Sequence, residues 1–169
     1  MAKMMSPNVT IVWVPLAGIA NPAAPKVAEL AAGINISCAI VTGFTLGATD
    51  SDTDDSKTIC DEGNVSTPTF DNYEANLSFF RSDLVNVTAI FDTAFNLFKV
   101  PRVEGYLVMR VGKKSTAAFT AGVNGDLVSV YRVVSDSPQD IEGEGGAPIQ
   151  FTVPFLPQGV MHLNIPVVA

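Results

Sequence analysis

The sequence predicts a mainly β domain, a β-sandwich or partial barrel with one packed α-helix. Three observations support this fold class. Apolar residues alternate with polar ones through most of the chain, only two segments show helical features, and 47% hydrophobic content in 169 residues is enough for one core. Only 16% of the residues are charged, which argues against a disordered chain. We therefore expect residues 1–169 to form a single domain.

The predicted strands follow from period-2 alternation, in which every second side chain faces the same side of a sheet. The clearest case is YEANLSFF, where Tyr73, Ala75, Leu77 and Phe79 share one face. Similar alternation predicts strands near residues 9–13, 34–40, 103–111, 149–155 and 161–167. Residues 126–134 are almost wholly apolar, which suits a strand that is covered on both faces or lies in an interface.

Two segments depart from the strand pattern. The first, APKVAELAAG, predicts a short helix of about two turns that Pro25 can begin and Gly33 can end. The second helix is expected after Ser82 or Asp83, since either residue can cap it. Its apolar residues recur at helical spacing and should pack on a sheet. They are Val87, Phe91, Ala94 or Phe95, and Phe98.

The N-terminal region loosely resembles a secretory signal, because Lys3 precedes a long apolar stretch. Strand-like alternation from Val9 to Trp13 and the interruption by Pro15 favour mature structure instead. No stretch reaches the roughly 20 apolar residues that cross a bilayer, so we expect a soluble chain with no membrane partner.

The longest connection between strands is expected at about residues 43–69. It contains the acidic segment ATDSDTDDSKTICDEG, residues 48–63, in which six acids and one lysine give −5 of the chain's net charge of −7. The acids are Asp50, Asp52, Asp54, Asp55, Asp61 and Glu62. A loop of this length without structure of its own is usually functional or ordered by a partner. A second, Gly-rich acidic excursion is expected at residues 135–148.

The aspartates of the acidic segment raise the question of whether it binds a metal ion. Asp50, Asp52 and Asp54 match the first, third and fifth positions of a calcium loop. The match fails at the sixth position, where Asp55 stands instead of glycine, and at the twelfth, where Asp61 stands instead of glutamate. The three aspartates are therefore weak metal candidates, and a solvated or interface-facing acidic loop is favoured.

The sequence contains few residues that could support catalysis. The single histidine, His162, is expected on the polar face of the last strand beside Asn164. No nucleophile elbow, phosphate-binding glycine loop or Cys-x-x-Cys pair occurs. Glu142 and Glu144 lie among glycines, which give two carboxylates no fixed separation. We expect no catalytic residue, no cofactor and no enzymatic activity.

The two cysteines differ in their surroundings. Cys38 falls on the apolar face of the strand expected at residues 34–40, so it should be a small core residue. Cys60 lies in the acidic segment. A Cys38–Cys60 bridge remains open, because sequence does not show whether the two sulfurs meet.

Three stretches together resemble the major tail tube proteins of long-tailed, siphovirus-type bacteriophages, especially those that infect actinobacteria. They are WVPLAGIANPAAPKVAELAAGINIS, VTGFTLGATDSDTDDSKTICDEGNVSTPTF and YEANLSFFR. The resemblance runs from about Trp13 to Arg81 and continues in the expected order through FDTAFNLF and GYLVMRVG. From Gly112 onward it rests on strand order alone.

The resemblance implies the tail tube fold and a structural virion protein. Subunits of that family form hexameric rings that stack into a hollow tube, and genomic DNA passes through the lumen. Tape measure, tail tip and terminator proteins are the other implied partners. The virion tail is the implied location, with the host cytoplasm during assembly. A net negative subunit fits this role, because clustered basic residues would hold the DNA instead of conducting it.

The resemblance also implies that residues 43–69 reach a neighbouring subunit or ring. The acidic segment is then an assembly loop that meets basic groups such as Lys113, Lys114 or Arg102 of a neighbour, and lining the lumen is the second choice. The alternative function is a β-sandwich binding module that uses the acidic loop for calcium-dependent recognition. Physical reasoning alone leaves open whether the tail is contractile or flexible.

Overall fold

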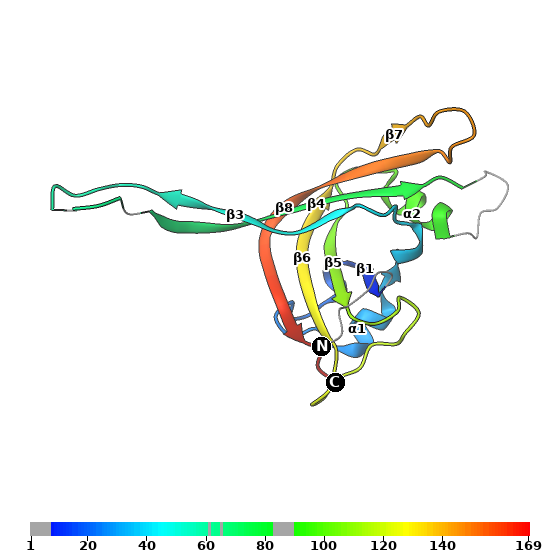
Figure 1. Cartoon of the computed structure of the whole chain (residues 1–169). Coiled ribbons are helices and arrows are strands. Elements are labelled where there is room, and N and C mark those ends of the chain that lie inside the picture. The colour runs from blue at the N-terminus through cyan, green and yellow to red at the C-terminus, as the bar shows by residue number, and fades with distance from the viewer. Residues whose placement is uncertain (1–7, 61, 65, 83–89) are drawn as a thin grey trace, which may run out of the picture.

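The computed structural model describes residues 8–60, 62–64, 66–82 and 90–169. Eight strands form one sheet in the order β2-β1-β5-β6-β8-β4-β3, and β7 adds to β8 outside this path. The strands are β1 Val9–Pro15, β2 Ile34–Asn35, β3 Thr45–Asp54, β4 Thr67–Phe80, β5 Glu104–Val111, β6 Leu127–Ser135, β7 Gln139–Ile141 and β8 Gln150–Pro166. All of these strand pairs are antiparallel, so the predicted mainly β fold is confirmed (Figure 1).

The main core lies between one face of the curved sheet and helix α2, Ile90–Phe98. Phe98 is fully buried, and its ring meets those of Trp13 and Phe155 at centroid distances of 5.2 and 5.1 Å. These edge-on aromatic contacts explain why a helix with β-branched residues in its first turns is stable here. The predicted packing of this helix is confirmed over its described residues, whereas Asp83 and Val87 lie outside them.

A second, smaller core covers the opposite face of the central strands. Helix α1, Val27–Ala32, contributes the buried Leu30, which packs in one cluster with Val12 and Val130. Gly33 ends this helix as predicted, and its N–H donates to the Leu30 carbonyl. Strand β6 therefore has buried residues on both faces, which confirms the prediction for residues 126–134.

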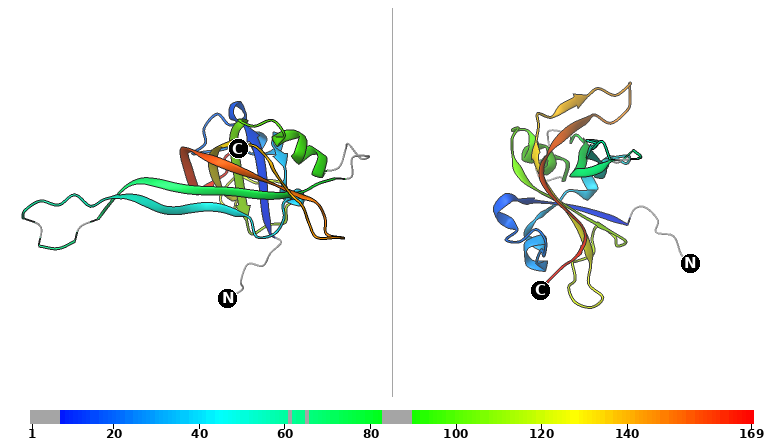
Figure 2. Two further views of the ribbon diagram at one scale, coloured as in Figure 1. Left: turned by 90° about the horizontal axis from the view of Figure 1, so that it is seen from above. Right: turned by 90° about the vertical axis from the view of Figure 1, so that its left-hand side faces the viewer.

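Strand β8 is long and changes partners along its length. Its first six residues pair with β4, and the part from Phe155 onward pairs with β6. The β6–β8 register shifts twice, near Gly159 at φ 71° and near Asn164 at φ 53°. Such bulges bend a strand. Strand β8 thus curves away from β4 at Phe155, as the two views of Figure 2 also show.

Two predicted loops and one predicted strand need correction. Strand β2 ends at Asn35, and a 3-10 turn, η2 Ser37–Ala39, replaces the predicted strand to residue 40. The turn buries Ile36 and Ala39, so Cys38 faces outward and the prediction of a core cysteine is wrong. The expected excursion at 135–148 contains a short strand, β7, paired to β8.

The expected loop at 43–69 is largely a β-hairpin. Strands β3 and β4 pair from Thr45↔Asn76 out to Asp54↔Thr67, with register shifts on both sides of Asp52. The hairpin extends far from the rest of the fold (Figure 1). We call residues 49–72 the arm, and the remainder of the described chain the body.

Candidate functional site

The described residues of the arm form no apolar core of their own. Polar side chains tie its two strands together: Thr69 Oγ1 donates to the Asp52 carbonyl at 3.0 Å, and Asn72 Nδ2 donates to Asp52 Oδ1 at 2.9 Å. Large apolar residues on the arm point outward, with Phe70 72% exposed and Ile59 fully exposed. Because a two-stranded ribbon alone is marginally stable, these features suit an element that completes its packing against a partner.

The structure spreads the predicted acidic residues along the arm. Asp50, Asp52 and Asp54 are exposed on β3, while Asp55 and Glu62 are exposed in the irregular tip. Asp61 lies outside the described residues. Apart from the cross-strand bonds, these carboxylates face solvent, so the arm is a charged surface and not a buried site.

The three weak metal candidates do not come together. Register shifts between Thr49 and Asp52 and between Asp52 and Thr53 break the alternation that would place them on one face. Ser56 instead donates from its side chain and its backbone N–H to Asp54, which lowers the pKa of that carboxyl. In the part of the chain that the structure describes, no three His, Cys, Asp or Glu side chains are grouped to hold a metal ion.

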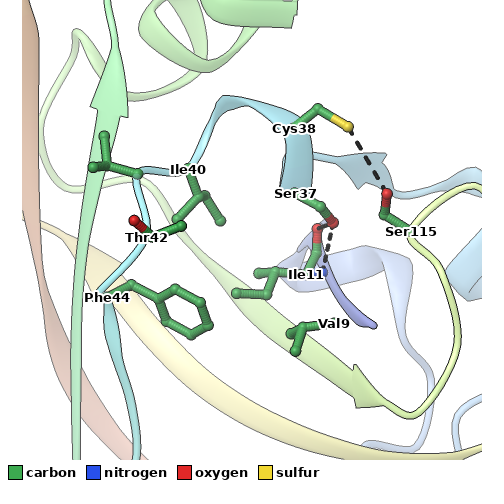
Figure 3. A pocket seen from close by; sticks show the side chains of 9 residues that line it. Val9, Ile11, Ser37, Cys38, Ile40, Thr42, Phe44 and Ser115 are labelled. Carbon is green, nitrogen blue, oxygen red and sulfur yellow. Dashed lines mark hydrogen bonds between the residues drawn. The ribbon is translucent and has the colours of Figure 1, made fainter. Parts of the chain in front are cut away.

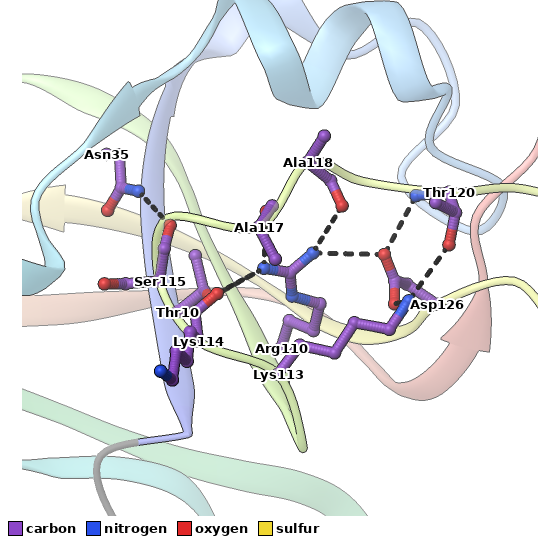
Figure 4. A network of polar contacts seen from close by, with 10 residues as sticks. All are labelled: Thr10, Asn35, Arg110, Lys113, Lys114, Ser115, Ala117, Ala118, Thr120 and Asp126. Atoms are coloured by element: carbon purple, nitrogen blue, oxygen red, sulfur yellow. Dashed lines mark hydrogen bonds and ion pairs between the residues drawn. The ribbon is translucent and has the colours of Figure 1, made fainter.

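The strongest electrostatic arrangement lies in the body, where sequence reasoning did not find it (Figure 4). Arg110 of β5 is 1% exposed and forms an ion pair with buried Asp126, Nη1 to Oδ2 at 3.1 Å. Its guanidinium also donates to the carbonyls of Lys114, Ala117 and Ala118. One arginine therefore holds the whole β5–β6 loop against the sheet. The only sequence signal was an arginine within an otherwise apolar strand.

Asp126 also accepts hydrogen bonds from the Lys113 ammonium, at 2.6 Å, and from the Thr120 N–H, at 2.9 Å. Burial alone would raise the pKa of this carboxyl. The hydrogen bonds from Lys113, Thr120 and Arg110 outweigh burial, and the pKa of Asp126 is lowered. The carboxylate is thus charged and structural.

This network bears on the three basic residues expected to meet the acidic arm. Lys113 is already paired with Asp126 within its own subunit. Lys114 and Arg102 are exposed, and Arg102 adopts a left-handed backbone conformation at φ 68°. Lys114 and Arg102 are therefore better placed than Lys113 to meet another molecule.

A shallow pocket of about 300 Å³ opens between β1, η2 and the segment that leads into β3 (Figure 3). Its walls are mainly apolar, with Ile11, Ile40 and Phe44 among them. Cys38 lies at its rim, with Sγ 3.8 Å from Ser115 Oγ. The residues that line it carry no carboxylate and no imidazole, so this pocket offers no acid–base pair.

Other residues weighed as catalytic are scattered. His162 is half-buried on β8 opposite Val130, while Glu142 and Glu144 are exposed in the turn after β7. The structure does not bring these three groups into one site with the pocket. Cys38 and Cys60 are both free and exposed, so the open question of a bridge is answered in this structure by two separate thiols.

The single antiparallel sheet and the projecting hairpin define the class of protein: a β-sheet protein with a polar arm. Comparison with known proteins identifies the family of this chain. A family model described as phage tail tube protein matches residues 1–169, so the chain belongs to the phage tail tube protein family. Its role is therefore structural, in a phage tail. No curated protein matched the sequence.

The fold also resembles a solved structure. A chain in the cryo-EM structure of the anti-feeding prophage (AFP) baseplate, 6-fold symmetrised, matches with a TM-score of 0.52 and 10% sequence identity. The match covers 96% of this chain and 95% of that one. At this identity the likeness concerns the fold alone. Within the described residues, no helix is long and apolar enough to span a membrane.

Proposed function

We propose that this chain is the major tail tube subunit of a long-tailed phage, which self-assembles into hexameric rings that stack as a hollow conduit for DNA. The arm carries this proposal. Its backbone pairs only with itself among the described residues, and it projects beyond the body (Figure 2). A polar ribbon of marginal intrinsic stability is stabilised further when a neighbouring subunit packs against it.

The charge of the arm suggests what it meets. Asp50, Asp52, Asp54 and Asp55 are exposed along the arm, with Lys57 as the one lysine of the acidic segment. A basic surface of a neighbouring copy, with Lys114 or Arg102, complements this charge. Lining the lumen is the second arrangement, in which the same acids repel the phosphates of passing DNA.

Open sheet edges support assembly of several copies. Among the described residues, no strand pairs with the outer edge of β3, and β8 has a partner only on its β6 side from Leu156 onward. Exposed edges promote uncontrolled association unless they are covered. A closed ring covers them by pairing each copy with the next.

Membership in the family supports the remaining parts of the proposal. The tape measure protein and the tail tip or terminator proteins are the further partners, and DNA passes without specific binding. The subunit works in the virion tail after assembly in the host cytoplasm. Its task is to shape the tube, and it needs no catalytic residue.

Negative-stain electron microscopy of the purified chain tests the proposal. The parent should form rings or hollow tubes at high concentration. Thr49 and Asn72 face each other in the hairpin, so replacing residues 50–71 by Asn-Gly closes the ribbon with a tight turn. This variant should melt near the parent temperature but form no tubes. Normal tubes from the shortened chain would refute the assembly role of the arm.

A charge variant separates the two arrangements of the arm. Asp50, Asp52, Asp54 and Asp55 are changed to Asn. If they meet a basic surface, tubes should weaken, and parent assembly should be sensitive to salt, since the screening length is near 10 Å in about 0.1 M salt. If they line the lumen, tubes should form normally and bind DNA.

A matched control removes four charges elsewhere. Asp136→Asn, Asp140→Asn, Glu142→Gln and Glu144→Gln change the exposed acids around β7 and should leave tubes unchanged. Equal loss of tubes in both charge variants would refute a specific arm contact. A large rise in melting temperature with calcium in the parent would instead favour the binding-module function, because a ligand bound only by the native state stabilises it.

A further inference from the structure

The arm leaves the body where two paired strands separate. Strand β4 pairs with β8 through Ala75↔Phe155, and this pairing ends there. Beyond this point β8 follows β6, while β4 continues into the arm with β3. An open groove of about 590 Å³ lies between the diverging strands, with Asp52, Phe70 and Tyr73 on one side and Pro157 and Met161 on the other.

Beyond the last β4–β8 pair, toward the arm tip, Tyr73 is the only residue of β4 that is still buried. It is 4% exposed, and its ring centroid lies 5.7 Å from that of Tyr131 in the main core. Facing it across the hairpin is Ala48 of β3. From Asn72 outward no described arm residue is buried, so Tyr73 marks the junction between arm and body.

The Tyr73 hydroxyl joins three strands. It accepts a hydrogen bond from the Gln158 N–H of β8 at 2.8 Å and donates one to the Arg132 carbonyl of β6. The β6–β8 register passes from Tyr131↔Met161 to Val133↔Pro157, so Arg132 and residues 158–160 have no partner across that boundary. The hydroxyl therefore fills a gap that the bulge opens in the ladder.

These contacts use the hydroxyl as donor and as acceptor at once. Burial raises the pKa of Tyr73 despite opposing hydrogen bonds from the β8 backbone, so the phenol keeps the proton that it donates. A phenylalanine would preserve the ring contact with Tyr131 but would leave the Gln158 N–H and the Arg132 carbonyl without this partner.

We propose that the Tyr73 hydroxyl is a positioning group that fixes the direction in which the arm leaves the body. A hairpin attached through β4 alone could swing about the last β4–β8 pair, because among the described residues no strand of the body pairs with the arm beyond it. The tie to β6 and β8 removes this freedom. The inference rests on the proposed function in one respect: a fixed arm matters for assembly because its partner is a second copy of this chain.

The two native cysteines allow a direct test in the unassembled protein. Cys60 lies in the arm tip and Cys38 in the body, and both are exposed and free. Nitroxide labels on both thiols report the distribution of arm-to-body distances by pulsed electron spin resonance. Tyr73→Phe should lose the distance peak of the parent and give a broad distribution. Tyr106→Phe removes the same atom from the smaller core and should leave the distribution unchanged.

Assembly of unlabelled protein gives the second measurement. Tyr73→Phe should keep the far-ultraviolet circular dichroism of the parent but need about tenfold more protein to form tubes, as expected for a lost hydrogen-bonded tie. Tyr106→Phe should assemble like the parent. This contrast separates an effect on arm direction from a general loss of stability.

Each outcome decides the inference. An unchanged distance distribution in Tyr73→Phe, or a parent distribution as broad as that of the variant, would overturn it. So would unchanged assembly of Tyr73→Phe when the arm-shortened chain forms no tubes. If the arm-shortened chain forms normal tubes, the proposed function fails separately, while the distance measurement still decides whether Tyr73 fixes the arm.

Discussion

Replacing Asp126 by asparagine should strongly destabilise the body. The change removes the only carboxylate that forms an ion pair with Arg110 among the described residues, and the Arg110 side chain is 1% exposed. Loss of one partner of a buried ion pair costs about 3–5 kcal/mol, because a desolvated charge remains without compensation. The Thr120 N–H also loses a charged acceptor at 2.9 Å. We therefore expect a loss near the middle of that range, about 4 kcal/mol.

The assay is urea unfolding of the monomeric protein, followed by tryptophan fluorescence of buried Trp13. Lys113→Met is the matched control, since it removes the other side-chain partner of Asp126. The Lys113 side chain is 44% exposed, so this control should lose no more than about 1 kcal/mol. A loss below about 1 kcal/mol for Asp126→Asn would refute the view that Arg110 depends on this carboxylate.

The difference in unfolding free energy between the parent and Asp126→Asn should depend on pH. The folded pKa of Asp126 lies below its unfolded value of 3.8. Its stabilising contribution is therefore complete above the unfolded value and is lost as pH falls through the lower folded value. The stability difference between parent and Asp126→Asn should shrink below about pH 4, and a difference that grows on acidification would contradict the assignment.

Four further substitutions test the core and the polar surface. Phe98→Ala should lose about 3–5 kcal/mol in the same assay, as large core truncations do, and Phe95→Ala less because it is only half-buried. Gly105→Ala would place a Cβ 2.6 Å from Cζ2 of Trp13, so we expect a loss of about 1–3 kcal/mol, and parent-like unfolding would disprove this close contact. His162→Gln should leave tube formation intact by electron microscopy, whereas loss of tubes would reveal a role for the imidazole.

Alternation of apolar residues predicted the parts of the fold that bury one face. Tyr73, Ala75, Leu77 and Phe79 are all buried as expected, because a strand on a core must alternate. Helix α2 was predictable for a similar reason, since its apolar residues repeat at helical spacing. In both cases burial imposes a period on the sequence.

The arm was mistaken for an irregular loop because its strands bury nothing. In β3 the residues after Ala48 are Thr, Ser and Asp, which leave no apolar period to detect. Backbone pairing and cross-strand bonds such as Thr69 to Asp52 hold this part of the hairpin instead. A pattern of side chains cannot reveal pairing that depends on the backbone.

Arg110 and Cys38 show a second limit of prediction from the sequence. Arg110 was not singled out from the sequence, because its partners come from a loop that only the fold brings back to β5. Cys38 was expected inside because apolar residues surround it, yet the turn η2 rotates it outward. In both cases the outcome depends on a place where the chain changes direction, since a linear period ends at such a point.

The charge and the shape of the arm favour contact with the body of a neighbouring copy over contact with another arm. Two arms from neighbouring copies carry the same excess of acids, so pairing arm with arm brings like charges together across a ribbon. Pairing an arm with a body meets no such penalty when the body offers Lys114 or Arg102. An apolar arm would lack this discrimination, and its exposed edges would join any other strand. In the proposed assembly, the acids would act against arm-to-arm association as well as for attachment to a neighbouring body, which is what ordered growth of a tube requires.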